Sequence, residues 1–375
     1  MIPLFKPWIT KSDIKAVIIA LKKPQLTDGP ILRKFETEFA KCVGARYAIG
    51  VSSGTASLHL SLLSIGVKPG DEVIVPDMTF CATANSVIMT GAKPILADID
   101  DSLNISPLSL EKKISSKTRA IIPVHFAGYS CEMSSILKIA KKNRLKIIED
   151  CAHSFGTIYR NKHVGNFGHV GCFSFYPTKN ITTIEGGMIV TNSKKIAQQI
   201  ELLRNHGMTR NLLQRDNNLQ PWEYDVKTPG FNYRLDEIRS SLGLSQVKRF
   251  REIETRRITA AKYYNKKLKN VKGIEIVNLE KKRKHSYHMY LIKIKNDFGI
   301  SRNKVHEKLF RKGIRTSVHY KPLHMYSYFK NLKLKNDEFP KSTVAYKELL
   351  TLPLFPAIKR EHQDYVIENI LKLKK

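Results

Sequence analysis

The 375-residue chain is long enough for two or three domains and carries a formal net charge of +31 at pH 7. Its 42% hydrophobic and 9% aromatic residues are typical of a folded globular protein and exclude a mainly disordered one. No apolar run reaches the ~18–20 residues of a membrane-spanning helix, and no signal-peptide core is evident. The five cysteines form no C-x-x-C pair, so we expect a reduced, cytoplasmic protein without disulfides or a zinc site.

The excess of positive charge has two interpretations. Clustered Lys and Arg side chains neutralise phosphates in nucleic-acid-binding proteins. Here the charges are scattered, with the densest stretches at 266–272 and 281–285, and no basic motif is interleaved with aromatic residues. We therefore favour solvated surface lysines over nucleic-acid binding. A diphosphate ligand would need only two or three of these charges.

The first two-thirds of the chain alternate short apolar runs with helical patterns, which predicts an α/β fold with a mostly parallel central sheet. In chain order we expect helices at 10–21 and 31–42, a strand at 47–52, a helix at 55–64, and strands at 72–76, 94–97 and 120–124. There follow a helix at 134–142, strands at 145–149, 171–175 and 188–191, and a helix at 194–204.

Beyond residue 235 a long charged helix, to about 268, is expected to lead into a smaller α/β domain. That domain would contain strands at 274–277 and 289–294 and a helix at 304–311. The sequence therefore predicts a large domain over 1–250 and a small C-terminal domain over 251–375.

Asp150 directly follows the apolar run at 145–149. Open α/β sheets bind their ligands at the carboxyl ends of parallel strands, so this carboxylate is a candidate ligand-binding group. It could equally cap the next segment, and taken alone the pattern favours the cap.

A predicted strand also runs into Ser53-Gly54-Thr55, which begins a helix. Glycine allows a ligand to approach the backbone closely, and a helix N-terminus offers free N–H groups and partial positive charge to an anion. Small hydroxylic residues at a helix start are usually only caps, so this motif is weak by itself.

Lys179 lies in a stretch of small and aromatic residues, GCFSFYPTKNITTIEGGM, at 171–188. A single lysine is most often a surface residue. One held in such surroundings can be partly buried, which lowers its pKa and allows it to form a Schiff base with a carbonyl compound.

These segments, in this order, resemble the DegT-like nucleotide-sugar aminotransferases, which depend on pyridoxal 5'-phosphate (PLP) and have the aspartate-aminotransferase fold, fold type I. The resemblance runs almost end to end and is most specific around Lys179. Its other motifs are LTDGP at 26–30, SGTA at 53–56, VIVP at 73–76 with TF at 79–80, GAKP at 91–94, PVH at 123–125, EDCAH at 149–153, LRNHG at 203–207, GFNYR at 230–234, HSYH at 285–288, TSVHY at 316–320 and LPLFP at 352–356.

The resemblance implies roles around the cofactor ring. Lys179 would bind PLP covalently and then act as general acid and base. Asp150 would pair with the pyridine nitrogen and keep it protonated. Phe80 would stack on the ring, with core packing as the alternative, and His153 would lie against it where many relatives carry glutamine.

The resemblance also implies a phosphate cradle and a homodimer. Gly54, Thr55 and Ser174 match residues that hold the cofactor phosphate. Asn232 matches an asparagine that reaches the phosphate of the neighbouring subunit's cofactor, so the active sites would be shared between two subunits.

Five residues lie in segments that line the nucleotide-sugar pocket of relatives: Thr27, Asn180, Arg234, His319 and Tyr320. Each is equally well explained as structural. Ile184 departs from the family pattern, because a glycine or another small residue is common at its position.

The resemblance implies transamination from glutamate to a nucleotide-linked keto-hexose, with carbon 4 of a 6-deoxy sugar favoured. Relatives that replaced the lysine by histidine act as dehydratases, and Lys179 is present here. Two alternatives stay open: an aminotransferase of free sugars or cyclitols, and a basic regulatory or nucleic-acid-binding protein that kept the fold. The chain has no H-E-x-x-H motif and no Walker loop, so we expect no metal site.

Overall fold

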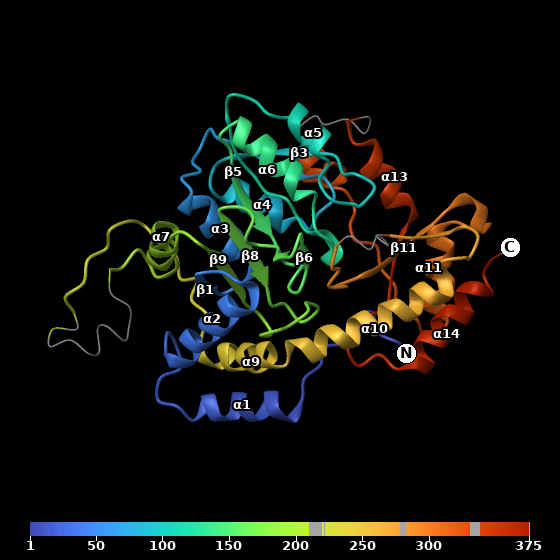
Figure 1. Ribbon diagram of the computed structural model, residues 1–375, viewed down its shortest axis with the longest axis horizontal. Helices are drawn as coiled ribbons and strands as arrows, with labels where there is room; N and C mark the ends of the chain where they lie inside the picture. Colours follow the sequence, from blue (N-terminus) through green and yellow to red (C-terminus); the bar gives the residue numbers. More distant parts are fainter. Residues whose placement is uncertain (210–219, 221, 278–282, 331–337, 375) are drawn as a thin grey trace.

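The computed structural model describes residues 1–209, 220, 222–277, 283–330 and 338–374. Figure 1 shows a central sheet covered by helices and, beside it, a smaller sheet with its own helices. None of the helices in these ranges is both long and apolar enough to span a membrane.

The central sheet has seven strands in the order β1-β9-β8-β5-β4-β2-β3. Their bounds are β1 Tyr47–Val51, β2 Glu72–Pro76, β3 Lys93–Ala97, β4 Thr118–Ile121, β5 Lys146–Asp150, β8 Val170–Ser174 and β9 Gly187–Thr191. The pairs β2–β3, β2–β4, β4–β5 and β5–β8 are parallel, whereas β9 is antiparallel to β8 and β1. The predicted α/β fold with a mostly parallel sheet is confirmed.

Alternate residues of each strand enter two separate cores, because successive side chains point to opposite faces of a sheet. Ile147 packs in the core beneath α2 and α6, and Ile148 packs in the core beneath α3, α4 and α7. Both faces are covered, so the strands are near-continuous apolar runs in the sequence. The helices are α1 Lys11–Leu21, α2 Pro30–Val43, α3 Gly54–Ser64, α4 Ala82–Met89, α5 Pro107–Lys112, α6 Met133–Lys142 and α7 Lys194–Arg204.

The long helix predicted over 235–268 is in fact two helices, α9 Glu237–Lys248 and α10 Phe250–Leu268. Asp236 caps α9, and the helix stops at Arg249, which has φ −109° and ψ 18°. The Arg249 guanidinium binds the Asp13 carboxylate at 2.6 Å and the Trp8 carbonyl at 2.5 Å. These distant contacts hold the break, and no local sequence signal marks it.

A second sheet has the antiparallel order β10-β11-β12, with β10 Ile274–Ile276, β11 Tyr290–Ile294 and β12 Leu349–Leu352. It packs with α10, α11 Arg302–Arg311 and α14 Arg360–Leu371 around a third core, which Ile2 joins from the start of the chain. The division at residue 250 stays a prediction; it falls between α9 and α10. The remaining elements are β6 Ile158–Tyr159, β7 Lys162–His163, α12 Ser327–Lys330, α13 Pro340–Glu348, and three short 3-10 helices, η1 Phe126–Gly128, η2 Asn296–Phe298 and η3 Leu323–Met325.

Candidate active site

A cavity of about 430 Å³ lies at the carboxyl ends of the strands of the central sheet. Its walls come from the segments that follow β1, β2, β4, β5 and β8, and from the chain that carries the second sheet. The predicted site residues in its lining are Gly54, Thr55, Phe80, Asp150, His153, Ser174, Lys179, His319 and Tyr320. The fold therefore gathers into one cavity residues that are far apart in the sequence.

Lys179 follows β8 in a turn closed by a hydrogen bond from its backbone N–H to the Tyr176 carbonyl, at 2.9 Å. The residue as a whole is half-buried, but its amine lies inside the protein. Burial lowers the pKa of Lys179 to about 8, and the nearby Asp150 charge acts in the opposite direction. A lysine with this pKa is neutral in an appreciable fraction of molecules near neutral pH, as a nucleophilic amine must be.

Asp150 is the last residue of β5 and is buried. Its carboxylate accepts hydrogen bonds from the Thr83 hydroxyl at 2.9 Å and from the Ala152 backbone N–H at 3.0 Å. Burial raises the pKa of Asp150, although these two donors and Lys179 oppose that effect. A buried, oriented carboxylate of this kind fits the protonated pyridine nitrogen of PLP. The sequence analysis missed Thr83, which α4 supplies.

The start of α3 and the end of β8 form an anion cradle. Ser53 caps α3 by accepting a hydrogen bond from the Ala56 N–H at 3.0 Å, and the first N–H groups of a helix have no intrahelical partner. A Cβ atom on Gly54 would lie 2.8 Å from Cβ of Ser174, so glycine allows the Ser174 hydroxyl to approach the helix start. Gly54, Thr55 and Ser174 together fit a phosphate group.

Aromatic rings, from Phe5, Phe80, His153, His288 and Tyr320 among others, form another part of the cavity wall. His153 stacks on His288 with ring centroids 4.5 Å apart, and Nε2 of His153 lies 3.3 Å from the Tyr320 hydroxyl. Burial lowers the pKa of both histidines, so their rings are neutral. Phe80 is 54% exposed at the cavity edge, which contradicts the alternative that it only packs in the core. Phe5 and His288 line the cavity but were missed, because they come from distant parts of the chain.

Four predicted residues lie outside this cavity. Asn180 is buried behind Lys179, where its amide donates to the carbonyls of Phe155 and Ser286 at 2.9 and 3.3 Å. Asn232 is exposed, and Arg234 donates to the Asn205 side chain at 2.6 Å. Thr27 is half-buried and forms a backbone bridge with Asp236. None of the four lines the cavity of its own subunit.

Ile184, the departure from the family pattern, has φ +70° and is 62% exposed. This left-handed backbone conformation is strained for a β-branched residue and easy for glycine. The turn after Lys179 is therefore held in a conformation that glycine would adopt more readily.

Arg257 was also missed. Its buried guanidinium lies 3.5 Å from the carbonyl oxygens of Lys179, His288 and Leu354. The acceptors of its guanidinium among the described residues are backbone carbonyls, and burial lowers its pKa to about 10. Arg257 thus links the backbone of Lys179 to one end of the strand pair β11–β12, where His288 precedes β11 and Leu354 follows β12.

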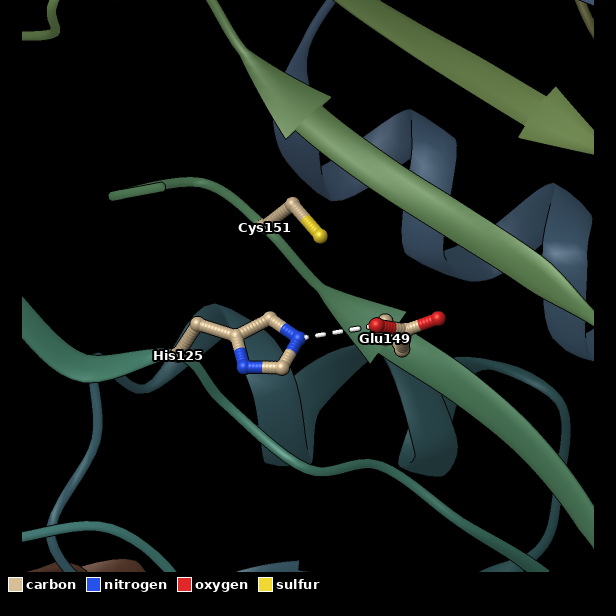
Figure 2. Close-up of side chains that lie close together, drawn as sticks. All are labelled: His125, Glu149 and Cys151. Carbon is tan, nitrogen blue, oxygen red and sulfur yellow. Dashed lines mark hydrogen bonds and ion pairs between the residues drawn. The ribbon is translucent and has the colours of Figure 1, made fainter. Parts of the chain in front are cut away.

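His125, Glu149 and Cys151 lie close together behind the cavity, and Figure 2 shows the hydrogen bond between the first two. Nδ1 of His125 accepts from the Cys131 N–H, so Nε2 carries the proton and donates to Glu149 at 3.0 Å. The Glu149 carboxylate also accepts three backbone N–H groups, at 2.6–2.7 Å, from residues 165, 167 and 168. These four donors occupy the carboxylate, so we expect the cluster to order the loop at 165–168 rather than to bind a metal ion.

A family model described as the DegT/DnrJ/EryC1/StrS aminotransferase family matches residues 7–371. The chain belongs to this family. It is a PLP-dependent sugar aminotransferase, as the resemblance implied. The spore coat polysaccharide biosynthesis protein SpsC of Bacillus subtilis is 38% identical over 373 residues, which cover 98% of this chain and 96% of SpsC.

Two solved structures show the same fold along the whole chain. PseC of Helicobacter pylori, an aminotransferase involved in the biosynthesis of pseudoaminic acid, superposes with a TM-score of 0.93 and 33% identity, covering 100% of this chain and 99% of PseC. Spr1654 of Streptococcus pneumoniae, in its PMP form, superposes with a TM-score of 0.94 and 30% identity, covering 100% of this chain and 99% of Spr1654. Spr1654 was also solved in its PLP form.

Proposed function

We propose that this enzyme transfers the amino group of glutamate to the keto group of a nucleotide-linked hexose, a 4-keto-6-deoxy sugar. The observation that carries the proposal is the pair of Lys179 and the buried Asp150, in one cavity with the anion cradle at the start of α3. PLP supplies an electron sink when it is bound. The involvement of PseC in pseudoaminic acid biosynthesis and of SpsC in spore coat polysaccharide biosynthesis supports a sugar of this kind.

Each cavity residue has a proposed task. Lys179 holds the cofactor through its amine and then carries a proton to and from the substrate, because its pKa of about 8 allows both protonation states near neutral pH. Asp150 keeps the pyridine nitrogen protonated. Phe80 and His153 lie on the ring, and Gly54, Thr55 and Ser174 bind the phosphate.

The sugar would contact His319 and Tyr320, which line the same cavity. Burial lowers the pKa of His319 to about 4, so this side chain offers a neutral imidazole to a hydroxyl group. We assign Thr27 and Arg234 to the nucleotide-sugar pocket as well, and Asn180 would support that pocket from behind Lys179, where its amide is bound to backbone carbonyls. Because Thr27 and Arg234 lie outside the cavity of their own subunit, this assignment requires a second subunit.

The enzyme is proposed to be a cytoplasmic homodimer with shared active sites. Asn232 is exposed and follows the described segment 222–230, at the left of Figure 1. Three apolar side chains of this segment, Trp222, Tyr224 and Val226, are 66%, 41% and 55% exposed. Apolar residues exposed together in this way are typical of an interface. The five free cysteines are compatible with a reducing compartment.

A substrate screen tests the proposal. The enzyme, loaded with PLP, would be incubated with glutamate and a panel of 3-keto and 4-keto nucleotide sugars, free keto sugars and keto cyclitols, and the products identified by mass spectrometry. We expect amination of a 4-keto nucleotide sugar, and no product with the Lys179→Ala variant. Amination of a free sugar or cyclitol alone would overturn the proposed substrate.

A further inference from the structure

A buried carboxylate outside the cavity connects two segments that supply aromatic residues to its mouth. Asp77 directly follows β2 and has no exposed surface. It does not line the cavity, whereas Phe80, three residues later, does. The second segment carries Tyr320 and then Leu323 and His324, which are also buried.

Asp77 binds this second segment through both its backbone and its side chain. Its carbonyl accepts the Leu323 N–H at 2.8 Å. One carboxylate oxygen accepts the His324 backbone N–H at 2.9 Å, and the other accepts Nδ1–H of the same residue at 2.7 Å. The Ser342 hydroxyl donates to the second oxygen at 2.6 Å. We call these four residues, Asp77, Leu323, His324 and Ser342, the Asp77 clasp.

Further contacts hold both partners of the clasp, Asp77 on the sheet and the segment with Leu323 and His324. The Asp77 N–H continues the sheet by donating to the Ala97 carbonyl at 2.8 Å. The His324 ring stacks on Phe339 with centroids 4.8 Å apart, and Leu323 packs in the core under α3 and α4. Pro322 fixes the backbone between Tyr320 and Leu323, since its ring restricts φ.

Phe80 and Tyr320 are therefore each three residues from the clasp, and their ring centroids are 5.8 Å apart. Tyr320 in turn reaches Nε2 of His153 at 3.3 Å. We propose that Asp77 is a positioning residue of the aminotransferase reaction, which sets the place of the Phe80–Tyr320 pair at the mouth of the active site. This inference rests on the proposed roles of Phe80 and Tyr320 in that site.

Asp98 provides a matched control. It follows β3, beside Asp77 on the same sheet edge, and its carboxylate accepts the backbone N–H groups of Lys341 and Ser342 at 2.9 Å. Asp98 thus binds the start of α13, which Asp77 also contacts through the Ser342 hydroxyl, but its hydrogen bonds among the described residues do not reach the segment at 320–324. Asp98→Ala removes a buried carboxylate of the same kind without cutting the link to Leu323 and His324.

The first experiment measures amide hydrogen exchange in the apo-protein, which requires neither cofactor nor substrate. In Asp77→Ala, we expect the amides of 319–326 to exchange roughly ten-fold faster or more, because the carboxylate that accepts the backbone N–H and the Nδ1–H of His324 is lost while only the backbone bond to Leu323 remains. In Asp98→Ala, the increase should be confined to 339–344. Unchanged exchange at 319–326 in Asp77→Ala would overturn the clasp, whatever the substrate of the enzyme is.

The second experiment tests whether the effect reaches the reaction through Tyr320. Asp77→Ala should lower kcat/KM roughly ten- to a hundred-fold, since small displacements of positioning groups have effects of this size. In a Tyr320→Ala background the same change should lower it less than about two-fold further, because the residue that Asp77 positions is already absent. Fully additive losses would contradict the inference.

Two more variants keep the proposal testable if Asp77→Ala misfolds. Asp77→Asn should recover most of the activity, because the amide oxygen still accepts the His324 N–H and the ring can exchange the roles of its nitrogens. If Asp77→Ala does not fold, His324→Phe keeps the stacking on Phe339 and removes only the Nδ1 donor. We expect it to increase exchange at 319–326 by a smaller factor, and wild-type exchange and kcat/KM in this variant would overturn the proposal.

Discussion

The Asp150 carboxylate opposes the effect of burial on the Lys179 amine: burial lowers the pKa of Lys179 to about 8, and the negative charge of Asp150 raises it. Both groups lie in the cavity at the ends of the adjacent strands β5 and β8. The two effects together keep the pKa of the amine near neutral pH. The carboxylate is in place to pair with the protonated pyridine ring of PLP. The lowered pKa of Lys179 also makes the stability of the apo-protein depend on pH.

The first prediction concerns this dependence. Unfolding returns the Lys179 pKa from about 8 to its ordinary 10.5, so between these values the unfolded chain binds more protons than the folded one. The free energy of unfolding should therefore rise with pH across that window, by up to about 3 kcal/mol from this residue. Lys179→Met should lack this rise and be more stable than the wild type at neutral pH. Urea unfolding of both apo-proteins at about pH 7 and about pH 10 measures the difference; the same pH dependence in both would contradict the account.

The second prediction separates the electronic from the structural role of Asp150. Asp150→Asn keeps the shape and can still accept from Thr83, but it cannot stabilise a protonated pyridine nitrogen. Turnover should fall by more than about 100-fold while the Kd of PLP rises less than about 10-fold, a difference that steady-state kinetics and cofactor titration measure. Asp98→Asn, a change at a neighbouring strand end, should alter neither value. Near-normal turnover of Asp150→Asn would make Asp150 a structural cap.

The third prediction concerns the cluster in Figure 2. Glu149→Gln would place an amide nitrogen against N–H donors and should lower the free energy of unfolding by about 3–5 kcal/mol. The interactions with His125 and the backbone keep the pKa of Glu149 lowered despite burial, so this stabilisation exists above the ordinary pKa and is lost as pH falls through the lowered one. Chelators and added zinc should leave the Tm of the wild type unchanged. A Tm that zinc raises in the wild type, but not in Cys151→Ala, would show a metal site.

The fourth prediction tests the shared active site. Asn232→Ala should weaken PLP binding roughly ten- to a hundred-fold, since a hydrogen bond to a charged phosphate is worth about 1.5–3 kcal/mol. Mixing Lys179→Ala and Asn232→Ala subunits should place both lesions in one site of the mixed dimer and leave the other site intact. Recovered activity on mixing would support the shared site, and a fully active monomer in sedimentation would exclude it.

The sequence predicted the central sheet because its signals are local. Each strand is a short apolar run closed by turn residues, as in Glu72–Pro76, which is observed with the predicted bounds. The break at Arg249 was missed because Asp13, more than two hundred residues away, holds it. The strand β12 and the helix α14 were also missed: β12 is short, and α14 has no capping residue that marks its start.

Part of the site was predictable because the carboxyl ends of parallel strands meet at one edge of a sheet. Asp150 and Ser174 end neighbouring parallel strands, and such ends share one edge of the sheet. Lys179 was predicted through the motif around it. His288 and Phe5 were not: His288 lies in the HSYH segment that resembles the family, but the segment by itself gave no role, and Phe5 carries no local signal. Asn232 and Arg234 could be placed only by the resemblance, and a single subunit leaves them outside the cavity.

The central claim is that Lys179 carries the cofactor, and covalent trapping tests it most directly. The enzyme loaded with PLP is reduced with borohydride, which makes the lysine–cofactor bond permanent, and is then digested and analysed by peptide mass spectrometry. We predict one cofactor per chain, on the peptide that contains Lys179, and no label in Lys179→Ala. Label on a peptide with a different lysine, or an active enzyme without any label, would contradict the account.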